Sequence, residues 1–253
     1  MDEWRALAHE QTADSYLKMA TEEAIMNAVR NRTSPPTLRF YSWNRPAVSL
    51  GYFQNAEREL DLAACERDGI EIFRRLTGGG AVYKSPHSET NYSFIIREDE
   101  GLIPKDVEAS YTLLCGAIIT GLRSIGFPVE HKPINDITLF GKKISGNAQT
   151  RKDNVILHHG TILLHAETTP MFTYLRIPAE KLRAKHVTQA EELVTGLCTY
   201  KTVTQEHIHH AIIEGFRTTF RIRFSTSTLT AQEEKEAQEL YPRYRSTEFI
   251  FWK

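Results

Sequence analysis

The strongest pattern along the chain is a repeat of apolar residues at helical spacing. It runs through residues 105–124, with apolar side chains at Val107, Tyr111, Leu114, Cys115, Ile118 and Leu122. A second repeat covers residues 14–30 and is followed by Pro35-Pro36. Steps of three and four residues place such side chains on one face, so both stretches are predicted to be amphipathic helices. Cys115 lies on the apolar stripe and is expected to fill the core.

Between these helices the pattern changes to short runs of β-branched and aromatic residues. Residues 37–43 and 47–52 flank the turn Asn44-Arg45-Pro46, and they are predicted to pair as a hairpin. Further strand-like runs occur at residues 70–73, at 91–97 and between 127 and 165. Because helices do not alternate strictly with these runs, the pattern favours an α+β fold in which helices flank a mixed, largely antiparallel sheet.

The remainder of the chain is predicted to be mainly helical. Two sequences of the capping-box type, Thr202-x-x-Gln205 and Thr230-x-x-Glu233, are expected to open helices there. A chain of 253 residues with no repeat and no low-complexity linker is consistent with one large domain. We therefore expect a single domain over residues 1–253, with a helical C-terminal portion at about 202–253.

Composition excludes several classes of function. A formal net charge of −1 gives no global field that would attract nucleic acid or a membrane surface. No apolar run approaches the 18 residues of a transmembrane helix, and Met1–Arg5 begins no signal peptide. Three scattered cysteines indicate a reducing compartment and argue against a structural zinc site. We expect a soluble, cytoplasmic protein that binds neither nucleic acid nor membrane.

The most unusual local sequence is Arg-Arg-Leu-Thr-Gly-Gly-Gly-Ala-Val-Tyr at residues 74–83. Gly78, Gly79 and Gly80 carry no side chains, so their backbone N–H groups can approach a ligand closely. Successive N–H groups in such a turn form a concave anion site, and arginine adds planar donors that suit phosphate. The sequence is neither the spaced-glycine dinucleotide fingerprint nor a P-loop. It predicts a phosphate cradle, with a flexible turn as the alternative.

A second candidate element lies at residues 141–149, Gly-Lys-Lys-Ile-Ser-Gly-Asn-Ala-Gln. Alternate residues of a strand point to opposite faces, so one of the two lysines can point inward. We expect Lys142 to be solvated and Lys143 to stabilise charge on a phosphoryl or acyl oxygen. Asn135 and Asp136 precede this strand, and Asp136 is a candidate Mg²⁺ ligand or the cap of a turn.

A third element is His158-His159-Gly160-Thr161. Adjacent histidines on a strand face opposite sides, so they cannot chelate one metal in regular geometry. Gly160 allows another backbone or a ligand to come close.

These motifs occur in the order that is typical of one family. Arg-Arg-x-Thr-Gly-Gly-Gly-Ala-Val-Tyr, Asn-Asp, Gly-Lys-Lys-Ile-Ser-Gly-Asn-Ala-Gln and His-His-Gly-Thr follow one another along the chain. In this order they resemble the biotin/lipoate protein ligase superfamily, and specifically lipoate–protein ligase A. The resemblance runs from about Leu17 to Trp252. It implies a sheet flanked by helices, akin to the core of class II aminoacyl-tRNA synthetases.

The resemblance also implies a two-step reaction. ATP and lipoate would form lipoyl-AMP and pyrophosphate, and the lipoyl group would then move to a lysine of a lipoyl carrier domain. That carrier would be a glycine-cleavage H-like protein or a 2-oxoacid dehydrogenase E2. Residues implied to bind ATP or lipoyl-AMP are Arg75, Gly78, Gly79, Gly80, Ala81, Val82, Tyr83, Asn135, Asp136 and Lys143. Lys143 would be catalytic, Asp136 would hold Mg²⁺, and His159 and Gly160 would bind lipoate.

Three functions from different classes remain open. The first is an ATP-dependent lipoate–protein ligase, which we expect. The second is an ATP-independent octanoyl or lipoyl transferase that works through a cysteine thioester. Related transferases place their thiol in the interval that runs here from Cys115 to Cys198, and no cysteine lies between these two. The third is a non-catalytic nucleotide-binding subunit, which the presence of Lys143 disfavours.

Two-domain ligases continue into a small accessory domain that lipoate activation requires. The present sequence ends just after the region of resemblance. We therefore expect residues 1–253 to be a catalytic domain without an accessory domain, and a separate accessory subunit as a partner.

Overall fold

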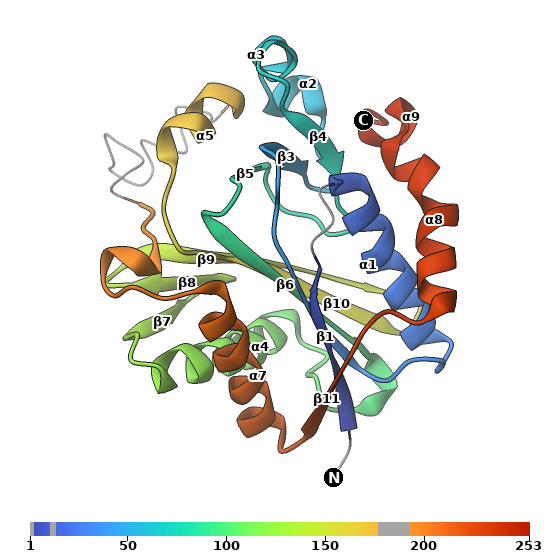
Figure 1. The fold of residues 1–253 in the computed structure, drawn as a ribbon, viewed down its shortest axis with the longest axis vertical. Coiled ribbons are helices and arrows are strands. Elements are labelled where there is room, and N and C mark those ends of the chain that lie inside the picture. The colour runs from blue at the N-terminus through green and yellow to red at the C-terminus, as the bar shows by residue number, and fades with distance from the viewer. Residues whose placement is uncertain (1–2, 11–13, 177–192) are drawn as a thin grey trace.

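The computed structural model describes residues 3–10, 14–176 and 193–253, and its core is a large mixed sheet (Figure 1). The strand order is β11-β1-β2-β6-β10-β9-β8-β7. The strands are β1 Glu3–Glu10, β2 Thr37–Tyr41, β6 Glu89–Arg97, β7 Val129–Lys132, β8 Asp136–Leu139, β9 Lys142–Lys152, β10 Val155–Leu163 and β11 Arg223–Ser227. Strand β1 is parallel to β2 and β11, and the other neighbours pair antiparallel. The predicted α+β fold with a mixed, largely antiparallel sheet is therefore confirmed.

A smaller sheet lies beside the large one and carries the glycine loop. Its order is β4-β3-β5, with β3 Ala47–Leu50, β4 Glu71–Arg74 and β5 Val82–Lys84. Strand β3 is parallel to β4 and antiparallel to β5. The predicted hairpin between β2 and β3 is wrong, because β2 pairs with β1 and β6 in the large sheet. The turn between β2 and β3 carries the chain from the large sheet to the small one. The local pattern of residues does not specify which strands β2 and β3 pair with.

Helices cover both faces of the large sheet. Helix α1 Ser15–Arg30 packs on one face, and α4 Val107–Ser124 and α7 Gln205–Phe220 pack on the other. The other described helices are α2 Ala56–Glu59, α3 Leu62–Arg67, α5 Thr168–Tyr174, α8 Ala231–Arg245 and α9 Thr247–Ile250. The capping box at Thr230 and Glu233 is confirmed. The box predicted at Thr202 is wrong, because Thr204 caps α7 and accepts a hydrogen bond from the His207 amide. No helix in the described ranges is long and apolar enough to cross a membrane.

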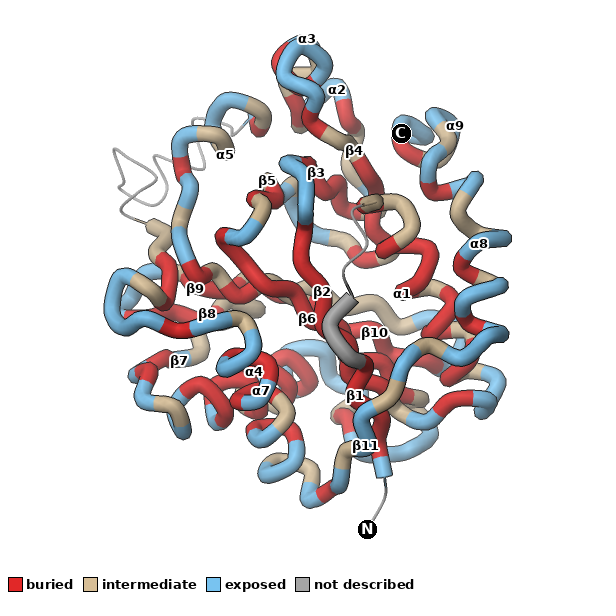
Figure 2. The backbone as a smooth tube through the Cα atoms, viewed as in Figure 1, coloured by how far each residue is buried: buried red, intermediate tan, exposed pale blue. Residues whose placement is uncertain are grey.

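Side chains along β6 point alternately to the two faces of the sheet, and this separates the core into two layers. Phe94 and Ile96 pack with α4 and α7, whereas Ile95 packs with Ile25 of α1. Successive side chains of a strand point to opposite faces, so this split follows directly from the sequence. The central strands are buried on both sides (Figure 2). We call the two sides of the large sheet the α1 face and the α4 face.

Helices α4 and α7 cross where two glycines let their backbones meet. A Cβ atom on Gly121 would lie 2.0 Å from the Ala211 carbonyl oxygen, and one on Gly215 would lie 2.0 Å from the Ala117 carbonyl oxygen. By contrast, a Cβ atom on Gly116 of the same α4 helix would meet nothing within 4 Å. The close crossing therefore depends on two particular glycines and not on α4 glycines in general.

We predict opposite effects of the same substitution at two positions of α4. Gly121→Ala should lower the free energy of unfolding by about 1–3 kcal/mol, because the added methyl overpacks the crossing. Gly116→Ala is the matched control and should raise it by up to about 1 kcal/mol, since alanine favours the helix. Urea denaturation of the three proteins measures the difference. Equal stabilities of the two variants would contradict the close crossing.

Candidate functional site

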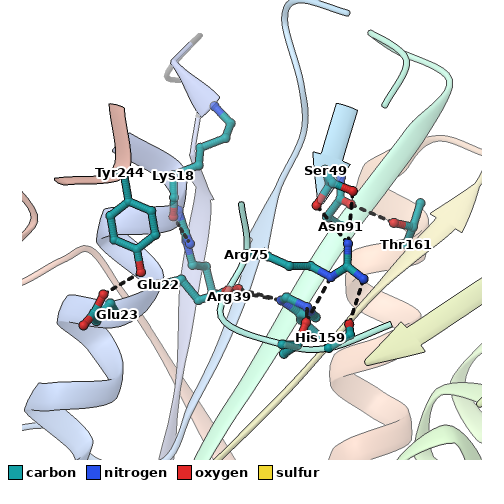
Figure 3. Close-up of polar contacts among 12 residues, drawn as sticks. Lys18, Glu22, Glu23, Arg39, Ser49, Arg75, Asn91, His159, Thr161 and Tyr244 are labelled. Carbon is teal, nitrogen blue, oxygen red and sulfur yellow. Dashed lines mark hydrogen bonds and ion pairs between the residues drawn. The ribbon is translucent and has the colours of Figure 1, made fainter. Parts of the chain in front are cut away.

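The glycine loop, residues 77–81, runs from β4 to β5 and reaches the large sheet through Thr77. The Thr77 hydroxyl lies 2.7 Å from Nε2 of His159 on β10, so two of the predicted site elements meet. Figure 3 shows the side chains of Arg75 and His159 in this region. Gly79 and Gly80 are exposed. Gly79 has φ +95°, a conformation that glycine adopts without strain.

The guanidinium of Arg75 lies buried beneath this loop. Its Nε donates to Thr77 Oγ1 at 3.1 Å, and Nη1 donates to the carbonyl and hydroxyl of Ser49, both at 3.2 Å. Nη2 donates to the carbonyls of Gly78 at 2.7 Å and Gly80 at 2.9 Å. These five bonds match the five N–H donors of a guanidinium. Burial lowers the pKa of Arg75 to about 10, so the group still carries its charge at neutral pH. The predicted contact of Arg75 with the adenylate stays a prediction.

His159 is held from its other side by Glu22 of α1. The His159 Nδ1 atom lies 3.2 and 3.1 Å from the two Glu22 carboxylate oxygens, and both side chains are buried. Burial raises the pKa of Glu22, but the opposing effect of the His159 ring and its hydrogen bond makes the net shift downward. Sequence reasoning missed Glu22. The available signal was a charged residue within the apolar stripe of the helix, four residues after Lys18.

The C-terminal end of the loop is attached to the large sheet through Lys84 of β5. Sequence reasoning missed this residue too. Lys84 Nζ donates to Glu89 Oε1 and Asn91 Oδ1, both at 3.1 Å, and to Thr161 Oγ1 at 2.5 Å. Since Lys84 and Glu89 are both buried, removing one partner would leave the other charge uncompensated. Thr77 and Lys84 thus anchor the two ends of the loop on β10.

Lys143 is the second residue of β9, and its side chain lies against Gly146 of the same strand. Its Nζ atom is 2.6 Å from Asp136 Oδ1, an ion pair whose geometry is not that of a hydrogen bond. A Cβ atom on Gly146 would lie 2.8 Å from the same Nζ atom. Gly146 pairs with Thr161 of β10, and directly opposite residues share a face of the sheet. Lys143 Nζ, Thr161 and His159 therefore lie together on the α1 face.

Gly160 faces the other way, toward a buried polar group on the α4 face. A Cβ atom there would lie 2.1 Å from Asn147 Oδ1 and 2.9 Å from the Tyr92 hydroxyl, which donates to Asn147. Asn147 Nδ2 donates to the Asn135 carbonyl at 2.8 Å, and Asn135 Nδ2 donates to the Asn147 carbonyl. This reciprocal pair holds the segment that carries Asp136. The lipoate contacts of His159 and Gly160 stay predictions.

The other predicted loop residues lead into β5. Val82 is exposed, and the ring of Tyr83 stacks on Tyr174 of α5 with centroids 5.6 Å apart. Ala81 packs against the apolar cluster of the small sheet. Their predicted contacts with the adenylate stay predictions.

The carboxylate of Asp136 beside Lys143 suits a metal ion whose other ligands come from a bound nucleotide and water. Within the described ranges no group of three His, Cys, Asp or Glu side chains could hold a metal. Asp136 is a single carboxylate beside a lysine, and Mg²⁺ in phosphoryl-transfer sites commonly uses one or two carboxylates plus phosphates and water. Asp136 therefore fits a nucleotide-bound Mg²⁺ and not a resident metal centre.

None of the three cysteines lies on the α1 face beside Lys143. Cys115 of α4 accepts a hydrogen bond from Asn147 Nδ2 at 3.5 Å on the α4 face, and Cys198 packs against the same core. Cys65 belongs to the small-sheet core. Burial raises the pKa of Cys115 to about 12, and burial followed by nearby acidic groups raises that of Cys65 to about 11. Cys115 fills the core, as predicted.

We predict a pH dependence of stability from His158, which lies on the α4 face. Burial lowers its pKa from 6.5 to about 3, so the folded protein keeps the ring neutral while the unfolded chain takes up a proton. Its contribution is fully present above pH 6.5 and is lost as the pH falls toward 3, at about 1.4 kcal/mol per pH unit. His158→Gln should flatten the acid limb of the unfolding free energy by that slope.

The exposed His210 offers a matched control, because His210→Gln should leave the acid limb unchanged. Urea denaturation at several pH values measures all three proteins. An acid limb in His158→Gln as steep as that of the wild type would contradict the buried neutral ring.

Comparison with known proteins adds independent findings. A family model described as "Lipoyl protein ligase A/B catalytic domain" matches residues 14–217. Octanoyltransferase LipM of Moorella thermoacetica is 35% identical over 268 residues, with 98% of this chain and 97% of the relative covered.

Two solved structures resemble the fold along nearly the whole chain. One comes from a study of a bi-partite lipoate protein ligase and its E2 lipoyl domain from Thermoplasma acidophilum. It has a TM-score of 0.86, 30% identity and coverage of 99% of this chain and 97% of that chain. The other is a lipoate-protein ligase A bound with ATP, with a TM-score of 0.85, 29% identity and 98% coverage of both chains. With the family model matching most of the sequence, the chain belongs to the lipoyl protein ligase A/B catalytic-domain family.

Proposed function

We propose that the chain attaches an octanoyl or lipoyl group to a lysine of a lipoyl domain, and that it first activates the acyl group as an adenylate with ATP. The observation that carries the second part is the arrangement of the α1 face. It holds an ammonium group and a glycine loop but no thiol. An acyl adenylate needs an anion cradle and a cation, whereas a thioester relay needs a reactive cysteine.

Adenylate formation joins two anions, the acyl carboxylate and the α-phosphate of ATP. The carboxylate–phosphate bond forms, the bond between the α- and β-phosphates breaks, and pyrophosphate leaves. Their repulsion falls when fixed dipoles and a cation stand where the charge gathers. The amides of residues 78–81 would supply the dipoles, and Lys143 would supply the cation. Asp136 keeps the ammonium in place through their 2.6 Å contact and is the residue that would hold Mg²⁺. When bound, that ion would neutralise phosphate charge.

The second step requires a good leaving group more than a protein nucleophile. In the mixed anhydride the acyl carbon is already activated, so the ε-amine of a carrier lysine can attack it and release AMP. The bond formed is an amide and the bond broken is the acyl–phosphate bond. Lys143 would then stabilise negative charge on the acyl oxygen and the departing phosphate.

ATP-independent octanoyl transfer is the second candidate, and the names of the curated relatives favour it. Judged by those names alone it has more support than the ligase, since LipM of Moorella thermoacetica is 35% identical. Its thioester would have to form on Cys198, the most exposed of the three cysteines. The Cys198 thiol donates to the Val203 carbonyl at 3.6 Å and packs against the α4-face core. Among the described residues no cation forms a hydrogen bond or ion pair with this thiol, whereas reactive cysteines lie beside electropositive groups.

Two partners follow from the proposal. The acyl acceptor would be a lipoyl domain, of the H-like or E2 type, and the Thermoplasma acidophilum study includes an E2 lipoyl domain beside its ligase. That ligase is bi-partite. We therefore propose that a separate subunit also assists the present chain during acyl activation.

Intact-mass analysis of a lipoyl domain tests the proposal. The domain is incubated with the chain, octanoate or lipoate, and Mg²⁺, with and without ATP and with and without an accessory subunit from a bi-partite ligase. We expect the octanoyl or lipoyl mass increment only when ATP is present. Acyl transfer from an octanoyl carrier protein without ATP would contradict the adenylate route and support Cys198 instead.

Neighbouring lysines provide the matched pair of variants. Lys143→Ala should lower the acylation rate at least about a hundredfold, because it removes a cation aimed at developing charge. Lys142→Ala removes the same charge from the exposed position next to it and should change the rate less than about threefold. Cys198→Ser should leave the ATP-dependent rate intact. Loss of activity in Cys198→Ser with a normal rate in Lys143→Ala would reverse the assignment.

A further inference from the structure

We propose that Glu22, His159, Thr77 and Arg75 act as one positioning relay that holds the glycine loop with its carbonyls turned inward and its amide N–H groups directed at the phosphoryl group of the ligand. This inference rests on the proposed function, because it names how the anion cradle of that site is built. Glu22 and Thr77 are new positioning residues. Arg75 acts through the loop rather than by direct contact with phosphate.

The four side chains of the relay form a continuous series of hydrogen-bond contacts. Arg75 Nε can only donate, so Thr77 Oγ1 accepts its hydrogen at 3.1 Å. An ionised Glu22 carboxylate can only accept, so the hydrogen between it and His159 lies on Nδ1. The Thr77 hydroxyl lies 2.7 Å from Nε2, the other ring nitrogen of His159. These contacts connect the guanidinium of Arg75 to the carboxylate of Glu22 without a break.

The same guanidinium fixes the orientation of the loop peptides. Its Nη2 atom binds the carbonyl oxygens of Gly78 and Gly80. The Gly79 carbonyl between them faces Gly51, where an added Cβ atom would lie 2.0 Å from the oxygen. In a trans peptide the N–H points away from its own carbonyl. The N–H groups that follow these carbonyls, on Gly79, Gly80 and Ala81, therefore point away from the buried side.

These three amides are available to a ligand. Across the described residues, none accepts a hydrogen bond from the N–H of Gly79, Gly80 or Ala81. Gly79 and Gly80 are exposed, whereas Arg75 is 7% exposed and lies below them. Successive free amides form a concave anion site, and a positive charge beneath it adds to the attraction. The ligand chemistry that fits is a phosphoryl group with one negative charge, as in an acyl adenylate.

The relay links this cradle to a helix that lies outside it. Glu22 is on α1, and its carboxylate is the buried end of the chain of bonds. If Thr77 lost its hydroxyl, Arg75 Nε and His159 Nε2 would both lose their partner in a buried place, which is costly. The Arg75 guanidinium would then keep only its bonds to Ser49, Gly78 and Gly80, and the position of the two loop carbonyls would be less firmly fixed.

Binding of octanoyl sulfamoyl-adenosine, a non-hydrolysable acyl-adenylate analogue, tests the relay by isothermal titration calorimetry. We expect Thr77→Val to weaken binding about tenfold to a hundredfold, because it keeps the side-chain volume and removes one buried hydroxyl. Thr77→Ser restores the hydroxyl and should recover most of the affinity. Thr120→Val makes the same change at an exposed position of α4 and serves as the control for handling and folding.

Thermal denaturation shows whether Thr77→Val is folded. If it is not, a second variant, Glu22→Gln, tests the relay instead. Glu22→Gln preserves the shape of the side chain but removes the charged acceptor, and it should weaken binding of the analogue about tenfold. Wild-type affinity in Thr77→Val or Glu22→Gln, or equal losses in Thr77→Val and Thr77→Ser, would overturn the relay. A wild-type chain that does not bind the analogue would overturn the proposed adenylate route together with it.

Discussion

The glycine loop depends on one buried charge. Arg75 binds two loop carbonyls, both polar groups of Ser49 and the hydroxyl of Thr77, and in the part of the chain that the structure describes none of its hydrogen bonds goes to a carboxylate. A buried guanidinium is tolerated only when its donors are satisfied, so these five bonds and the loop conformation require each other. The loop is therefore rigid on its inner side and open on its outer side. In our proposal, that asymmetry makes the glycine triplet a preorganised anion site.

The division of the large sheet into two faces explains how the site is assembled. Alternation along β10 sends His159 and Thr161 to the α1 face, where the glycine loop and Lys143 lie. The same alternation sends His158 and Gly160 to the α4 face, with Asn147 and the core cysteines. Lys143 therefore lies on the opposite face of the sheet from Cys115 and Cys198. This separation is our reason for proposing an adenylate over a thioester, although curated relatives such as LipM of Moorella thermoacetica are named octanoyltransferases.

Much of the fold could be predicted from local pattern. The stripe of residues 107–124 became α4, and the opposite orientations of His158 and His159 followed from strand geometry. Strand pairing was harder, because the partner of β2 is set by packing over long sequence separations. Within the site, the glycine loop and the Lys143 segment stood out by composition. Glu22 did not, since nothing local indicates that a glutamate in a helix will meet a histidine 137 residues away.

The role of Arg75 shows a further limit of sequence reasoning. Arginine beside three glycines suggests a direct ligand for phosphate, but residue type alone cannot tell a donor that points at a ligand from one that points at the backbone. The hydrogen bonds of Arg75 to Gly78 and Gly80 are the basis of our proposal that it acts through the loop.

A crystal structure of the chain with octanoyl sulfamoyl-adenosine would test this account most directly. We expect the amide N–H groups of Gly79, Gly80 and Ala81 to donate to the sulfamoyl oxygens, with Lys143 beside the acyl carbonyl. Arg75 should still bind the Gly78 and Gly80 carbonyls, as it does in the present structure. A complex in which Arg75 leaves those carbonyls and contacts the sulfamoyl group itself would contradict the central claim.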